Sequence, residues 1–139
     1  QIFDERVAEN PILKHKHPLP SGWSEALYNH KAFTFWRDML AIPVETWSGD
    51  YRSELALFSI DVDAGIAPMG TIDHSQFYSG AEYSYCYFGG VRRGVFIEDY
   101  VYSVSNGGVM VHDVGDLATP IASVALPDFD PGAYCGYYY

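Results

Sequence analysis

The chain has 139 residues, of which 48% are hydrophobic and 17% aromatic, enough apolar material for the core of one ordinary domain. Eighteen acidic side chains against eight basic ones give a formal net charge of −10, so the chain repels nucleic-acid phosphates and anionic lipid surfaces. The longest stretch without a charged side chain, residues 100–111, is about half of the roughly 20 residues that cross a bilayer. We therefore expect no nucleic-acid partner and no membrane insertion.

The predicted secondary structure is all β. Short runs of β-branched and aromatic residues alternate with Gly, Pro, Asn and Asp turns, and no window has a helical apolar period. In chain order, the predicted strands are residues 32–36, 39–44, 55–61 and 69–74, followed by 94–97, 100–105, 109–113 and 121–126. The links at 37–38 and 98–99 are two residues long, as in tight hairpins.

The sequence also repeats itself. Three sets of segments share an apolar pattern: 2–12 with 111–121, 35–40 with 96–101, and 57–72 with 111–124. Repeats built from four short antiparallel strands are typical of β-propeller blades, which stack around a shared core. The sequence thus predicts about two and a half blades of a larger propeller.

The predicted organisation has four parts. Residues 1–20 form the last two strands of a preceding blade, 21–80 a complete blade with connecting loops, 81–127 a second complete blade, and 128–139 a tyrosine-rich tail. The chain starts inside a repeat and without Met, so we expect that further sequence precedes it. Open blade faces need covering, so the expected partners are the remaining blades, from a cleaved chain or another subunit. A homo-oligomer or filament is the alternative.

Three groups of segments resemble a known family. They are residues 24–33, residues 92–97 with 102–105, and residues 109–114 with 121–124. They look like the secreted bacterial and archaeal β-propeller family distantly related to WD40 repeats. The resemblance implies an exported propeller, of which this chain is the C-terminal portion, and it brings no established catalytic activity.

A serine motif and a pair of carboxylates are candidate sites. Residues 22–26 (Gly-Trp-Ser-Glu-Ala) are similar to a nucleophile elbow, but Pro18 and Pro20 exclude the central strand that an elbow follows. Asp61 and Asp63 precede Gly65 at a spacing that suits Ca²⁺, although two ligands are too few for a complete loop. No other cofactor is expected.

The histidines give a weaker signal. His15 and His17 lie on one side of a predicted strand, enough for an adventitious metal ion only. His30, His74 and His112 fall at predicted strand positions, and we expect them to be packed or hydrogen-bonded structural residues.

The cysteines and tyrosines favour an exported protein that binds other proteins. Cys86 and Cys135 lie in similar aromatic settings and predict one disulfide in an oxidising compartment, the alternative being two buried thiols. Tyrosines favour protein interfaces and also stack on sugar rings. The predicted interface residues are Tyr83, Tyr85, Tyr87, Tyr137, Tyr138 and Tyr139. The alternative for the segment between the two blades is that it only covers the sheet ends, with its rings half-buried.

The predicted function is a non-catalytic binding or structural scaffold, located outside the cell or in the cell envelope. Two alternatives remain open. One is part of a propeller enzyme with its active site in the central channel, and the other is a subunit of a cell-envelope or filamentous assembly.

Overall fold

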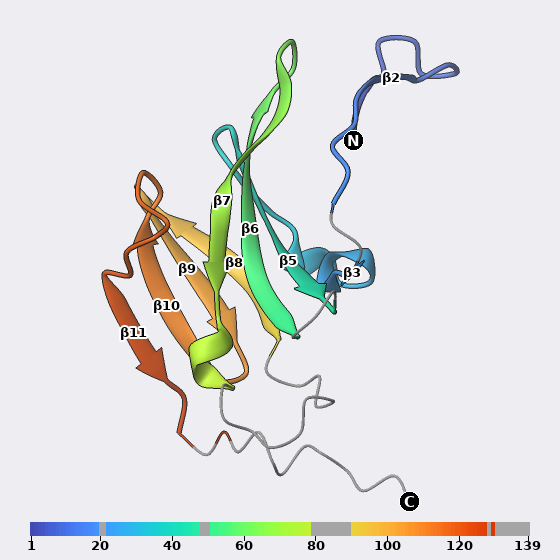
Figure 1. Ribbon diagram of the computed structural model, residues 1–139. Coiled ribbons are helices and arrows are strands. Elements are labelled where there is room, and N and C mark those ends of the chain that lie inside the picture. The colour runs from blue at the N-terminus through green and yellow to red at the C-terminus, as the bar shows by residue number, and fades with distance from the viewer. Residues whose placement is uncertain (20–21, 48–50, 79–89, 128, 130–139) are drawn as a thin grey trace, which may run out of the picture.

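The computed structural model of the chain describes residues 1–19, 22–47, 51–78, 90–127 and 129. In these residues the secondary structure consists of antiparallel strands and three 3₁₀ helices of three residues each. The strands form three separate sheets, shown in Figure 1. The predicted all-β class is confirmed.

The N-terminal hairpin is the smallest sheet. Strand β1 (Ile2–Asp4) pairs with β2 (Ile12–His15), and the pair extends away from the two larger sheets in Figure 1. It meets the first sheet at the tip of one hairpin, where Nε2 of His15 lies 3.1 Å from the carbonyl oxygen of Val62.

The first sheet runs from residue 22 to residue 73. In chain order its elements are β3 (Gly22–Trp23), η1 (Glu25–Leu27), η2 (His30–Ala32), β4 (Thr34–Trp36), β5 (Met39–Thr46), β6 (Arg52–Asp61) and β7 (Gly65–Asp73). Strands β5, β6 and β7 form an antiparallel meander. Both β3 and β4 pair with β5, at opposite ends, so η1 and η2 interrupt what would otherwise be one edge strand.

The second sheet is a simple meander of four strands. Helix η3 (Ser75–Phe77) follows the first sheet, and then come β8 (Val91–Ile97), β9 (Tyr100–Ser105), β10 (Gly108–Asp113) and β11 (Ala122–Ala125). Their spatial order is the order in the chain. Strand β8 lies against β4, β5 and β6, so the early strands of the two sheets meet.

Two matching hairpin turns occur at equivalent places in the two sheets. Residues 37–38 link β4 to β5, and residues 98–99 link β8 to β9, each closing a hairpin of the predicted length. The first residue of each turn, Arg37 and Glu98, has a φ of 56°, a conformation that non-glycine residues seldom adopt outside turns. The same strained turn in both sheets supports their origin as structural repeats.

The main core lies between the two sheets. One face of the first sheet supplies Met39, Ala41, Leu55, Leu57 and Ile72, and the facing side of the second supplies Val91, Phe96, Val101 and Met110. The backbones come close at Gly94, where an added β-carbon would lie 2.8 Å from Cδ2 of Leu55 and 3.1 Å from Cβ of Ala41. A larger residue at position 94 would push the sheets apart.

The structure corrects the predicted strand positions in three places. Residues 32 and 33, predicted to begin a strand, instead end and follow helix η2. His30 therefore lies in a 3₁₀ helix, and His74 lies beyond the end of β7 as the N-cap of η3, so neither is on a strand as predicted. Three strands are instead longer than predicted. Strands β6, β7 and β8 begin three or four residues earlier, because cross-strand pairing continues into polar and glycine residues.

Shortening Leu57 should test the core between the sheets. Its side chain is fully buried, so Leu57→Ala should lower the free energy of unfolding by about 2–5 kcal/mol. Ile97→Ala is the matched control, because 51% of Ile97 is exposed, and it should change the stability by about 0.5 kcal/mol or less. Urea denaturation of the chain measures both. Equal losses for the two variants would contradict this packing.

Candidate functional site

Three polar contacts join the two sheets across their shared core. At the turns, Nη1 of Arg37 lies 3.0 Å from Oδ1 of Asp99 in an ion pair. Nearby, the hydroxyl of Thr34 donates to the carbonyl oxygen of Gly94 at 2.8 Å. At the other end, the backbone N–H of Val91 donates to Oγ of Ser53 at 2.7 Å. These contacts set the register between the sheets.

A polar cluster closes the end of this interface opposite the turns. Arg92 donates to Oε2 of Glu25 at 2.9 Å and to Oδ1 of Asn106 at 3.2 Å. Burial raises the pKa of Glu45, against the lowering effect of the Arg92 charge. Burial and the Glu45 charge also raise the pKa of Tyr51. The guanidinium of Arg92 therefore compensates two carboxylates, and the cluster is a structural tie between β8 and the first sheet.

Two imidazoles are buried between the sheets. His74 and His112 are 0% and 2% exposed, and Nε2 of His74 lies 2.6 Å from Oγ of Ser103. Burial, opposed by the charge of Asp73 and assisted by the neighbouring His112, lowers the pKa of His74 to about 4. Burial also lowers the pKa of His112. Both rings are thus packed neutral at pH 7, as the structural interpretation predicted.

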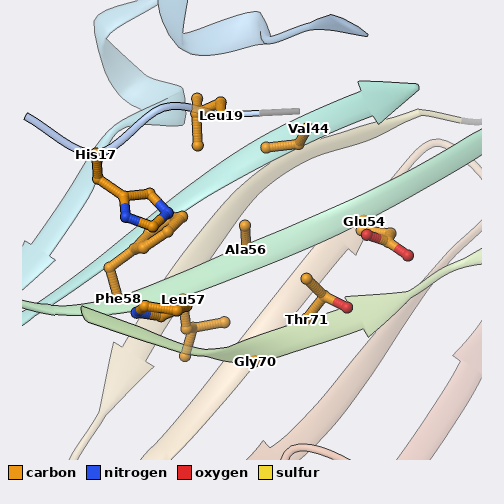
Figure 2. A pocket seen from close by; sticks show the side chains of 10 residues that line it. His17, Leu19, Val44, Glu54, Ala56, Leu57, Phe58, Gly70 and Thr71 are labelled. Atoms are coloured by element: carbon orange, nitrogen blue, oxygen red, sulfur yellow. The ribbon is translucent and has the colours of Figure 1, made fainter. Parts of the chain in front are cut away.

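The outer face of the first sheet is apolar and hollowed. A second apolar cluster lies there, made of Ile42, Val44, Ala56 and Phe58 with Ala26, Leu40, Ile60 and Ile66 at its margin. Figure 2 shows the hollow, a cavity of about 180 Å³, with His17 and Leu19 of the N-terminal segment over it. The His17 ring lies 5.3 Å from the ring of Phe58, centre to centre.

One carboxylate lines the same hollow. Glu54 lies at the far end from His17 in Figure 2, and partial burial together with the Asp73 charge raises its pKa. The remaining lining is mostly hydrocarbon, so the hollow offers a surface for apolar side chains.

The outer face of the second sheet is also apolar. Because neighbours along a strand point to opposite faces, the residues between the core positions form this face. They are Val95, Ile97, Tyr100, Tyr102, Val104, Val109, Val111, Ala122 and Val124, together with two charged residues, Arg93 on β8 and Asp113 at the end of β10, and cross-strand pairing places them side by side. All are half-buried or exposed, and neither apolar cluster of the described residues includes them. We call this set the open face of the second sheet.

The serine of the elbow-like motif has a local structural role. Ser24 caps η1 by accepting from the N–H of Ala26, and its hydroxyl donates to the carbonyl oxygen of Pro43 at 2.5 Å. Gly22 and Trp23 form an edge strand, whereas a nucleophile elbow follows a central strand. The motif joins β3 to the first sheet.

The calcium candidates lie at the tip of the β6–β7 hairpin. Oδ1 of Asp61 accepts from the N–H groups of Asp63 and Ala64, which lowers the pKa of Asp61 and closes the turn. Asp63 lies 3.6 Å from the ammonium of Lys14. No group of three or more potential metal-ligating side chains occurs among the described residues, so the calcium site stays a prediction. His15 and His17 point to different partners, Val62 and Phe58.

Several predicted residues lie outside the described residues. They are Cys86, Cys135, Tyr83, Tyr85, Tyr87, Tyr137, Tyr138 and Tyr139. The disulfide and the tyrosine interface therefore stay predictions.

The contacts between the sheets were not predicted from the sequence. The signal that could have found the Arg37–Asp99 pair is the repeat itself, which puts both residues in equivalent turns 61 positions apart. The Glu25–Arg92 pair has no such signal, because Glu25 belongs to the inserted helix η1.

Comparison with known proteins agrees with this architecture. The family model described as "Beta propeller domain" matches residues 1–117, and the chain belongs to this family. Each of the two larger sheets is thus a blade, and their interface is a blade-to-blade seam. No curated protein and no solved structure matches the chain.

The buried His74 should make the stability depend on pH. Above its ordinary pKa of 6.5 the imidazole is neutral in both states, so stability is complete. As the pH falls from 6.5 to about 4, the unfolded chain binds a proton that the folded chain excludes. The free energy of unfolding should therefore fall, on the order of 3 kcal/mol from this group.

Urea denaturation between pH 7 and pH 4 measures this slope. His74→Gln should remove most of it, since glutamine keeps a group able to bond Ser103 but does not titrate. His30→Gln is the control, because His30 is exposed, and it should leave the slope unchanged. An identical slope in all three proteins would contradict the assignment to His74.

Proposed function

We propose that this chain is part of an extracellular, non-catalytic β-propeller scaffold, and that it works by joining further blades through the outer faces of both sheets. β-Propellers serve as binding or scaffold domains in general, and the chain belongs to that family. The proposal that further blades join this chain rests on the side chains that point outward from its two blades.

The apolar character of both outer faces carries this proposal. A sheet that faces water on one side normally alternates apolar and polar side chains. Strands β9 and β10 instead present Tyr102, Val104, Val109 and Val111 outward, while Val101 and Met110 point into the seam. Apolar residues on both sides of one sheet indicate that another layer covers each side.

The outer face of the first sheet indicates where one neighbour belongs. Residues 1–19 already reach it, with His17 and Leu19 over the hollow and Lys14 paired to Asp63. Positions 2–4 and 12–15 are the strands predicted to end a preceding blade. We infer that this blade, once complete, fills the hollow with its own side chains. The hollow is then part of a seam and holds no ligand.

The polar groups in the seam favour a scaffold over an enzyme. The Ser24 hydroxyl, the Arg92 guanidinium and the imidazole of His74 all bond neighbouring protein groups. These bonds hold loops and sheets in place, and burial keeps Ser24 and His74, which are 6% and 0% exposed, from reaching a substrate.

Location outside the cell is part of the proposal and rests on composition. Twelve tyrosines, high aromatic content and few lysines are the features that favour export. Among the described residues, no helix has the length and apolar character to span a bilayer.

Hydroxyl-radical footprinting tests the covering of the open faces. Tyr100 and Tyr102 should be oxidised readily in the isolated chain and at least about ten-fold more slowly in the native protein from its source, because a neighbouring blade excludes solvent. Met69 is the internal control, since it lies on the edge strand β7 and is 38% exposed. Equal oxidation of both tyrosines in the two preparations would contradict the proposal.

A further inference from the structure

We propose that the open face of the second sheet receives a blade with a basic side chain in its first hairpin turn, opposite Glu98, and that a second copy of this chain does not fit there. This inference rests on the proposed function and adds the chemistry of the neighbour. It follows from using the observed seam as a template for the next one.

The two sheets present equivalent surfaces toward the C-terminal side. Ala41 of the first sheet pairs with Leu57, and Tyr102, 61 positions later, pairs with Val111. Ala41 and Leu57 face the second sheet in the observed seam. Tyr102 and Val111 therefore occupy the places that face the next blade.

The charge at the turn is reversed between the two equivalent places. In the observed seam the first sheet contributes Arg37, and its partner in the next sheet is Asp99 at 3.0 Å. Glu98 takes the place of Arg37 in the second sheet, with the same φ of 56°. A neighbour that repeats this contact must bring an arginine or a lysine to the place of Asp99.

A second copy of the chain brings the wrong charge. If the first sheet of another copy docked in the same way, its Asp38 would take the place of Asp99. Glu98 would then face Asp38, and a like-charge contact across an interface disfavours that partner.

A second copy also brings the wrong shape. In the observed seam the small residues Ala41 and Gly94 allow close approach, and the hydroxyl of Thr34 bonds the carbonyl of Gly94. In a self-docked pair, Tyr102 would stand in place of Ala41 and Phe33 in place of Gly94. Two aromatic rings would meet where the template has a methyl group and a glycine.

The hydrogen bond would be lost as well. Val95 replaces Thr34 at the equivalent position and has no hydroxyl to donate. The charge, the shape and the hydrogen bond thus all exclude a copy of the chain in this orientation. The open face of the second sheet therefore binds a different blade, and the basic residue in the turn of that blade gives the specificity.

Reversing the charge at position 98 in the native protein tests this inference. Glu98→Lys should raise the fraction of oxidisable Tyr102 about five-fold in footprinting at low salt, because an attractive pair becomes a repulsive one. Glu98→Gln should give an intermediate value, and about 0.5 M NaCl, a concentration that screens exposed charges, should remove the difference. Glu9→Lys is the control, since it makes the same charge change in the exposed loop of the N-terminal hairpin.

The outcomes separate this inference from the proposed function. Protection of Tyr102 that Glu98→Lys leaves unchanged or increases would overturn the basic neighbour while keeping a covered face. Tyr102 that is unprotected in the unaltered native protein would overturn both. A separate measurement tests whether a second copy binds the open face. The Tyr102 oxidation rate in the isolated chain should not depend on chain concentration. Protection that grows with concentration would show that a copy binds there.

Discussion

The structure depends on sheets that are apolar on both sides. The seam between the two blades buries one face of each, with Leu55, Leu57 and Val101 fully enclosed. The outer faces carry the same kind of side chain, represented by Phe58 on the first sheet and Tyr102 on the second. Because burial of apolar area is the main driving force for such packing, each outer face favours a further layer.

Polar contacts give this apolar packing its register. Apolar faces alone would let two blades slide past each other, but the Arg37–Asp99 pair and the Thr34–Gly94 bond fix one end of the seam. Arg92, bound to Glu25, fixes the other. Exposed ion pairs contribute little to stability, so we assign the Arg37–Asp99 pair mainly to register and to the choice of neighbouring blade. This division of roles explains why equivalent turns can carry opposite charges in successive blades.

Much of the fold could be predicted from the sequence, since short repeated strands and two-residue turns are local signals. The edge of the first sheet could not, because β3 contributes only Gly22 and Trp23, too few for an apolar pattern. The caps Ser24 and Asn29 do mark the starts of η1 and η2. Contacts such as Arg37–Asp99 depend on how two sheets are placed, which no local pattern encodes.

The central claim is that the blades of this chain are completed by others on both sides. The most direct measurement is an experimental structure of the native protein. We expect a further antiparallel sheet packed on each outer face, over Phe58 on one side and over Tyr102 and Val111 on the other. A native protein in which solvent covers both of these faces would contradict it.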